Sequence, residues 1–194
     1  MLFSTPKLMS DPAPAQSAKA VSKDIEHCDH TERVAQQLLS PKELGTIQEG
    51  WDKHFYSNGA FNLVQLVLYM LAQCGPAHLF ISSYSIAEQS LATLKRKLDQ
   101  GEILSVRFLI DNRVRTISPK PFDYLSTAFA GCYRCCALHA KVALVWNESH
   151  HWTLVGSQNA TNNPKLERGI IHTRREIFDF DYTNLHYAFE QGTT

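Results

Sequence analysis

The sequence predicts an α/β layered domain, in which helices flank a mixed, largely parallel sheet. From residue 63 onward, short apolar stretches typical of strands alternate with longer stretches of helical periodicity. This alternation is typical of β–α–β units, in which a helix connects two parallel strands. The chain of 194 residues is long enough for one domain with a substantial core.

Two segments are predicted to precede this domain. Residues 1–22 are rich in Ala, Pro, Ser and Lys and hold few apolar side chains, which predicts a flexible N-terminal tail. Residues 23–54 are predicted to form a helical N-terminal extension, because Val34 and Leu38 have helical spacing. Within this extension a new helix is expected at Ser40, where a proline and then a glutamate follow in the first turn.

The predicted elements of residues 55–194 follow in order. The strongest helical pattern is NLVQLVLYMLAQCGP, which places Leu63, Val67 and Met70 on one face and ends at Gly-Pro. Next come the buried strands HLFISSYS and LSVRFLID, separated by the amphipathic helix IAEQSLATLKRKLDQG. The domain is completed by a helix over PFDYLSTAFAGC, by the strands HAKVALVW, WTLVGSQN and RGIIHT, and by a last helix over YTNLHYAFEQ.

Composition and charge narrow the class of protein. Charged residues make up 20% of the chain and hydrophobic residues 44%, as in a typical globular protein. The formal net charge is zero, although residues 113–175 hold nine Lys or Arg against three Asp or Glu. The longest apolar run, residues 66–72, is far shorter than the roughly 20 residues of a membrane-spanning helix. We see no signal-peptide pattern and no disulfide layout among the five cysteines, so we expect a cytoplasmic protein.

Four polar side chains share a pattern on the strands HAKVALVW and WTLVGSQN. His139 and Lys141 lie on one face of the first strand, roughly 6.5–7 Å apart, because alternate residues of a strand point the same way. Ser157 and Asn159 share a phase after Gly156, which lets a ligand or another backbone approach closely. An imidazole, an ammonium, a hydroxyl and an amide together suit a phosphoryl group, which needs a nucleophile or acid, a cation and neutral donors.

A glutamate, Glu167, lies eight residues beyond Asn159. A bare His-x-Lys is more often part of a solvated strand face, but its combination with Gly-Ser-x-Asn and a downstream Glu is much rarer. This stretch resembles the HKD motif of the phospholipase D superfamily, which is His-x-Lys-x4-Asp followed by Gly-Ser-x-Asn and Glu. More loosely, GAFNLVQLVLYML, GPAHLFISSYSI, RFLIDNRVR and HAKVALV resemble small phospholipase D-like proteins carried by phages and mobile elements.

The resemblance implies a phospholipase D-like fold and a phosphodiesterase that needs neither a metal nor a cofactor, with a nuclease as the leading interpretation. It implies that His139 is the nucleophile and forms a phosphohistidine, so that one displacement becomes two easier steps. Lys141, Ser157 and Asn159 would hold the phosphate. Glu167 would accept a hydrogen bond from the imidazole and fix its orientation.

The superfamily uses two histidines, one as nucleophile and one as general acid, and short single-motif members build this site from two chains. Of the nine histidines only His139 is followed by x-Lys; the others are His27, His30, His54, His78, His150, His151, His172 and His186. A two-fold axis brings identical surfaces together. The resemblance therefore implies a homodimer in which both copies contribute His139 and Lys141, with nucleic acid as substrate and no stable membrane association.

One position departs from the motif, because Trp146 stands where the motif has Asp. This departure supports an alternative, a nucleic-acid-binding module that has lost the chemistry. A further alternative is a phosphatidyl hydrolase or transferase, although the sequence shows no amphipathic membrane segment. Arg168, Arg174 and Arg175 either follow a nucleic-acid backbone or form a charged rim, and Tyr84 either lines the site or belongs to the core.

A second pattern competes for His139. Cys132, Cys135, Cys136 and His139 have spacings that resemble a zinc ligand set. A strand or helix end rarely turns all four side chains inward, so we expect buried or half-buried thiols and no metal.

Overall fold

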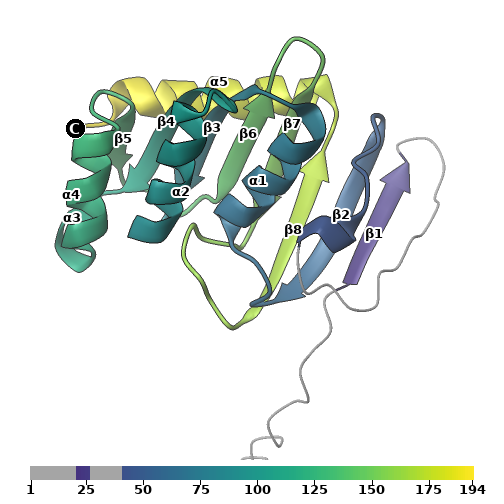
Figure 1. Ribbon diagram of the computed structural model, residues 1–194, viewed down its shortest axis with the longest axis horizontal. Coiled ribbons are helices and arrows are strands. Elements are labelled where there is room, and N and C mark those ends of the chain that lie inside the picture. Colours follow the sequence, from purple (N-terminus) through teal and green to yellow (C-terminus); the bar gives the residue numbers. More distant parts are fainter. Residues whose placement is uncertain (1–20, 27–40) are drawn as a thin grey trace, which may run out of the picture.

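The computed structural model describes residues 21–26 and 41–194 (Figure 1). Its strands are β1 (Val21–Glu26), β2 (Trp51–Asn58), β3 (Ala77–Ser83), β4 (Ile103–Asp111), β5 (Tyr133–Cys136), β6 (Val142–Trp146), β7 (His151–Gly156) and β8 (Leu166–His172). Its helices are the 3-10 turn η1 (Pro41–Leu44), α1 (Leu63–Cys74), α2 (Glu88–Asp99), α3 (Val114–Ile117), α4 (Pro119–Ala128) and α5 (Arg175–Gln191).

The strands form one sheet in the order β1-β2-β8-β7-β6-β3-β4-β5. Parallel pairing is limited to β3 with β4 and to β4 with β5, and the other neighbours are antiparallel. The prediction of a largely parallel sheet is therefore wrong. Helices separate consecutive strands in the parallel part, whereas β6, β7 and β8 follow one another without a helix. Connections that short join antiparallel strands, because a parallel pair needs a longer crossover.

The N-terminal elements also differ from the prediction. Val21–Glu26 is strand β1, paired with β2, and not the start of a helical extension. β2 crosses the predicted domain boundary between residues 54 and 55. In β2 the side chains of Lys53, Phe55 and Ser57 are buried and their neighbours are more exposed. This period of two is that of a strand, so residues 51–58 belong to the sheet.

The helix expected at Ser40 is a single 3-10 turn, η1. The remainder of the predicted flexible tail and helical extension, residues 1–20 and 27–40, lies outside the described residues. From residue 63 onward the predicted helices and strands are confirmed, with two exceptions at the site. His139 and Lys141 precede β6, and Ser157 and Asn159 follow β7, instead of lying within these strands.

The sheet separates two apolar clusters. α1, α2 and α4 cover one face, and α5 crosses the other (Figure 1). β3 shows how alternation supplies both clusters, because Leu79 and Ile81 point to the larger one while Phe80 packs with Phe178 and Phe189 of α5. Over residues 21–26 and 41–194, no helix combines the length and apolar character needed to cross a membrane.

The α5 face of the sheet is unevenly covered. α5 packs against β4, β5, β6 and β7. Beyond it, β8 and β2 carry side chains with large exposed fractions on the same face, 60% for Leu166 and 40% for Tyr56. This part of the face adjoins the edge of the sheet where the predicted site residues lie.

Gly169 of β8 lies directly over the ring of Phe55 in β2. A Cβ atom at Gly169 would overlap that ring, which is itself fully buried. The β2–β8 pair therefore depends on the absence of a side chain at this position.

We expect Gly169→Ala to lower the free energy of unfolding by about 1–3 kcal/mol, because the added methyl group overpacks the core. Urea unfolding measures this loss. Combining it with Phe55→Leu, which shortens the opposing side chain, should recover part of the loss, giving a non-additive double-mutant cycle. Strict additivity of the two changes would show that the ring is not what excludes a side chain at residue 169.

Candidate functional site

A cavity of about 560 Å³ lies at one edge of the sheet, where the start of β6, the end of β7 and the start of β8 meet. All five residues singled out from the sequence line it: His139, Lys141, Ser157, Asn159 and Glu167. The antiparallel order brings them together, because neighbouring strands that run in opposite directions place the start of one beside the end of the next.

Lys141 is the buried cation of this cavity. Its side chain is packed so that the residue is only 8% exposed, whereas His139 is exposed at the rim. Lys141 Nζ donates a 2.8 Å hydrogen bond to the carbonyl oxygen of His139 and lies 3.2 Å from both ring nitrogens of that residue. The ammonium therefore lies directly against the imidazole, and both groups line the same cavity.

The ammonium of Lys141 carries a cost. Burial lowers the pKa of Lys141 below its ordinary value of 10.5, and the negative charge of Glu167 only partly opposes this effect. An anion bound in the cavity would supply the negative charge needed to balance the ammonium. This is the arrangement expected of a group that binds phosphate.

The carboxylate of Glu167 is held by neutral donors. Ser157 Oγ donates to Oε2, and Asn163 Nδ2 donates to Oε1 at 2.7 Å. The resemblance implied that Glu167 accepts from the imidazole of His139, but in the structure both oxygens are engaged by these other side chains. Asn163 was not expected from the sequence, because an amide in the polar loop before β8 is indistinguishable from an ordinary turn residue.

Ser157 also joins β7 to β8. Its backbone N–H donates to the carbonyl oxygen of Arg168 at 2.9 Å, and its Oγ accepts from the backbone N–H of Arg168 at 3.0 Å. The ladder between the two strands thus continues beyond Gly156, and Ser157 is fixed relative to Glu167.

Asn159 presents an unpaired amide. Among the described residues, its buried Oδ1 atom has no hydrogen-bond partner. Buried polar atoms are almost always paired, so an unpaired one indicates a strained or functional position. Rotation of the amide by a half-turn exchanges oxygen for nitrogen at the same place, and that nitrogen would donate to a phosphate oxygen.

Tyr84, which follows β3, lines the side of His139. The two rings lie 5.3 Å apart at 60°, and Lys141 Nζ lies 5.7 Å from the centre of the tyrosine ring. Arg113 stacks on the same ring at 4.5 Å. Tyr84 is thus half-buried beside the site instead of being a core residue.

Asp111, at the end of β4, holds this side of the site. Its carboxylate accepts from Nε of Arg113 at 2.7 Å and from the backbone N–H of Leu138 at 3.0 Å. Burial raises the pKa of Asp111, but the hydrogen bonds from Arg113 and Leu138 outweigh burial and lower it below its ordinary value. Sequence reasoning missed Asp111 and Arg113, which lie outside the motif and reach it only through the fold.

The position at which the motif has an aspartate lies away from the cavity. Trp146 lies at the far end of β6, where its ring packs 5.4 Å from that of His78 and 5.7 Å from those of Phe178 and Tyr182. The rise of about 3.3 Å per residue separates it from the start of β6 by more than 10 Å. The departure therefore does not touch the cavity.

The zinc alternative does not fit the strand geometry. Cys135 and Cys136 are consecutive in β5, so their side chains point to opposite faces, and they belong to different apolar clusters. Within the part of the chain that the structure describes, no three His, Cys, Asp or Glu side chains gather as a metal site would need.

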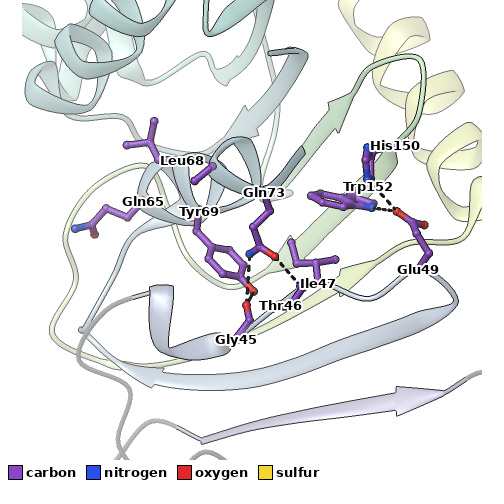
Figure 2. A pocket seen from close by; sticks show the side chains of 11 residues that line it. Gly45, Thr46, Ile47, Glu49, Gln65, Leu68, Tyr69, Gln73, His150 and Trp152 are labelled. Carbon is purple, nitrogen blue, oxygen red and sulfur yellow. Dashed lines mark hydrogen bonds and ion pairs between the residues drawn. The ribbon is translucent and has the colours of Figure 1, made fainter. Parts of the chain in front are cut away.

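A larger cavity, about 740 Å³, lies on the α1 side of the sheet (Figure 2). There Tyr69 Oη donates to the carbonyl oxygen of Gly45 at 2.7 Å, and Trp152 Nε1 donates to the carboxylate of Glu49 at 2.6 Å. Its walls are mainly apolar, and among the described residues that line it Glu49 is the only Asp, Glu, Lys or Arg. It therefore offers no cation to a phosphate.

Comparison with known proteins identifies the class of fold to which the chain belongs. No protein-family model matches the sequence, and no curated protein matches it. The phospholipase D family member Nuc from Salmonella typhimurium is similar in structure, with a TM-score of 0.50, 18% identity and coverage of 71% of this chain and 92% of Nuc. NucT from Helicobacter pylori has a TM-score of 0.50 and 15% identity, with coverage of 73% and 98%.

Polyphosphate kinase from Porphyromonas gingivalis is also similar, with a TM-score of 0.54, 13% identity and coverage of 74% of this chain and 26% of the kinase. At such identities the likeness concerns the fold. The chain thus has a phospholipase D-like fold, and it spans nearly the whole length of Nuc and NucT.

We expect Lys141→Met to be more stable than the unaltered protein at pH 7, by about 0.5–2 kcal/mol, because it removes a buried charge and keeps an apolar stem. Burial disfavours the charged ammonium in the folded protein. The buried lysine therefore lowers the free energy of unfolding at every pH at which the lysine of the unfolded chain is charged. This loss of stability disappears as the pH rises from the pKa of Lys141 in the folded protein to above 10.5, its ordinary value. Urea unfolding between pH 7 and 11 should therefore show the difference shrinking.

The matched control is Lys120→Met, at an exposed position of α4. It should show no such gain and no such pH dependence. A Lys141→Met protein that is less stable than this control at pH 7 would contradict the assigned cost of burial.

Proposed function

We propose that the protein is a phosphodiesterase, and specifically a nuclease that works through a phosphohistidine at a site shared by two copies of the chain. The observation that carries the proposal is the convergence of His139, Lys141, Ser157, Asn159 and Glu167 on one cavity. The five come from three strand ends, so their meeting is a property of the fold and not only of their spacing. The phospholipase D-like fold of the solved relatives supports the same chemistry.

The geometry suits a displacement in two steps. In the first, a ring nitrogen of His139 attacks phosphorus, the N–P bond forms, and the bond to the leaving oxygen breaks as that oxygen takes a proton from a general acid. In the second, water attacks phosphorus, its proton returns to the same group, and the N–P bond breaks. Lys141 offsets the charge on the non-bridging oxygens throughout, and the Asn159 amide orients them.

The general acid must come from elsewhere. Of the described residues that line the cavity, His139 is the one histidine. Because His139 is exposed at the rim, a two-fold axis passing close to it would bring the partner's His139 to the opposite side of the phosphate. The homodimer is thus part of the proposed mechanism.

Trp146 bears on the alternative of an inactive binding module. Its ring is packed at the opposite end of β6, among His78, Phe178 and Tyr182. The residues around the cavity keep their mutual contacts without an aspartate there, which favours an enzyme over a module that has lost the chemistry.

The direct test is turnover by purified protein in EDTA, offered bis(p-nitrophenyl) phosphate, single- and double-stranded DNA, RNA and phosphatidylcholine vesicles in parallel. We expect diester cleavage that His139→Ala lowers by roughly 10³-fold or more, as removal of a nucleophile does. His186→Ala, which alters a half-exposed imidazole on α5, is the matched control and should retain activity. Absence of turnover of every substrate would overturn the proposal, and cleavage of vesicles alone would replace it with the lipid alternative.

Subunit mixing tests the shared site. When the unaltered protein and His139→Ala are unfolded together in equal amounts and refolded, only dimers with two intact histidines should work. Activity should then fall to about one quarter of that of the undiluted protein, and not to one half, because random pairing makes it scale with the square of the intact fraction. A linear dependence would show that each chain works alone.

A further inference from the structure

Two arginine–tyrosine pairs stand beside the phosphate cavity without being part of it. The first is formed by Arg168 and Tyr56, which are direct cross-strand neighbours in β8 and β2. The guanidinium of Arg168 lies 5.5 Å from the centre of the Tyr56 ring, and its Nη2 is 2.8 Å from Nδ1 of His54. The ring of Tyr56 is 40% exposed, on the part of the sheet face that α5 does not reach.

This pair is joined to the cavity through the backbone. The backbone of Arg168 exchanges two hydrogen bonds with Ser157: its carbonyl oxygen accepts from the serine N–H, and its N–H donates to the serine Oγ. Leu166, on the same face of β8, and Lys165, just before it, line the cavity itself. Lys165 and Leu166 therefore link the cavity along the chain to Arg168 and, across the strand pair, to Tyr56.

The second pair is formed by Arg113 and Tyr84. The guanidinium lies 4.5 Å from the centre of the tyrosine ring, whose edge meets His139. The ion pair with Asp111 engages Nε of Arg113. The Arg113 side chain is 59% exposed. Among the described residues, its terminal nitrogens remain available to bind a ligand.

The strand order places the pairs on opposite sides of the cavity. Along the edge of the sheet the strand order is β2, β8, β7, β6, β3, β4, and the cavity lies where β8, β7 and β6 meet. Tyr56 and Arg168 belong to β2 and β8, whereas Tyr84 and Arg113 follow β3 and β4. With strands about 4.8 Å apart, the two pairs span roughly 15–25 Å across the site.

We propose that these two pairs bind a single-stranded nucleic acid on both sides of the phosphodiester that occupies the cavity. The proposal rests on the proposed function and names the form of its substrate. Each arginine contacts a phosphate flanking the central one, and the exposed face of Tyr56 stacks on an unpaired base. A cation–π contact with tyrosine keeps each guanidinium in place without neutralising it.

The cavity itself favours a single strand. The ammonium of Lys141 lies below the rim, so the phosphate must enter the cavity to meet it. A flexible strand bends into such a cavity and exposes its bases to aromatic rings, whereas a stacked duplex does neither without deformation. A lipid headgroup presents one diester, which leaves the outer arginines without a ligand.

The test is equilibrium binding in the His139→Ala background, which holds the substrate uncleaved. Fluorescence anisotropy with a labelled single-stranded oligonucleotide of roughly 4–16 nucleotides gives the Kd at several salt concentrations. We expect Arg113→Gln and Arg168→Gln each to weaken binding about 3- to 10-fold. Each should also reduce the slope of log K against log salt by about 0.7, the value for one lost phosphate contact on a single strand. Tyr56→Ala should weaken binding with little change in that slope.

Matched controls separate these effects from general ones. Arg96→Gln, on the exposed side of α2, and Tyr187→Ala, at a 70% exposed position of α5, should bind as the background protein does. Thermal unfolding of each variant shows whether it is folded. Arg113→Lys and Arg168→Lys retain the charge and should restore the salt slope, which a purely structural role would not predict.

Two results would overturn the inference. One is an affinity and salt slope for Arg113→Gln and Arg168→Gln that match those of Arg96→Gln. The other is a duplex of the same sequence bound as tightly as the single strand. Both are independent of catalysis, because turnover of bis(p-nitrophenyl) phosphate by the unaltered protein reports on the proposed function alone.

Discussion

The antiparallel register of β6, β7 and β8 is the constraint on which the site depends. Val142 pairs with Val155, and Gly156 pairs with Gly169, so the segments that flank these pairs are brought to one edge. A shift of one residue in either ladder would turn every side chain to the opposite face of the sheet. The two glycines permit close approach at the point where the ladder ends, and beyond it Ser157 and Arg168 continue the hydrogen bonding.

With this register the ammonium of Lys141 is buried. Lys141 immediately precedes β6, and its ammonium sits beneath His139 with Glu167 as the nearest opposing charge. The carboxylate of Glu167 is shared with Ser157 and Asn163, so it only partly compensates the lysine. The charge of the ammonium is therefore only partly balanced within the site, and such a local cost to stability is typical of functional positions.

The sequence predicted the local features of this fold and failed at the long-range ones. α1 was found because Leu63, Val67 and Met70 have helical spacing and Gly-Pro ends the run, and β3 and β4 were found as apolar runs. Whether strands are parallel depends on which ones pair, and no local periodicity encodes that. The helix predicted from residue 23 rested on the helical spacing of Val34 and Leu38, which follow β1 in the chain. The pairing of β1 with β2 is a long-range contact that this local spacing does not encode.

The same distinction applies to the site. The motif located His139, Lys141, Ser157, Asn159 and Glu167, because their spacing along adjacent strands is regular. Asp111, Arg113 and Asn163 carry no such spacing. Asn163 lines the cavity, and Asp111 and Arg113 lie beside it, because β4 and the loop before β8 end at the same edge of the sheet. They contact the residues of the motif or lie beside them, so a motif search finds the candidate reacting groups, whereas their surroundings are set by the fold.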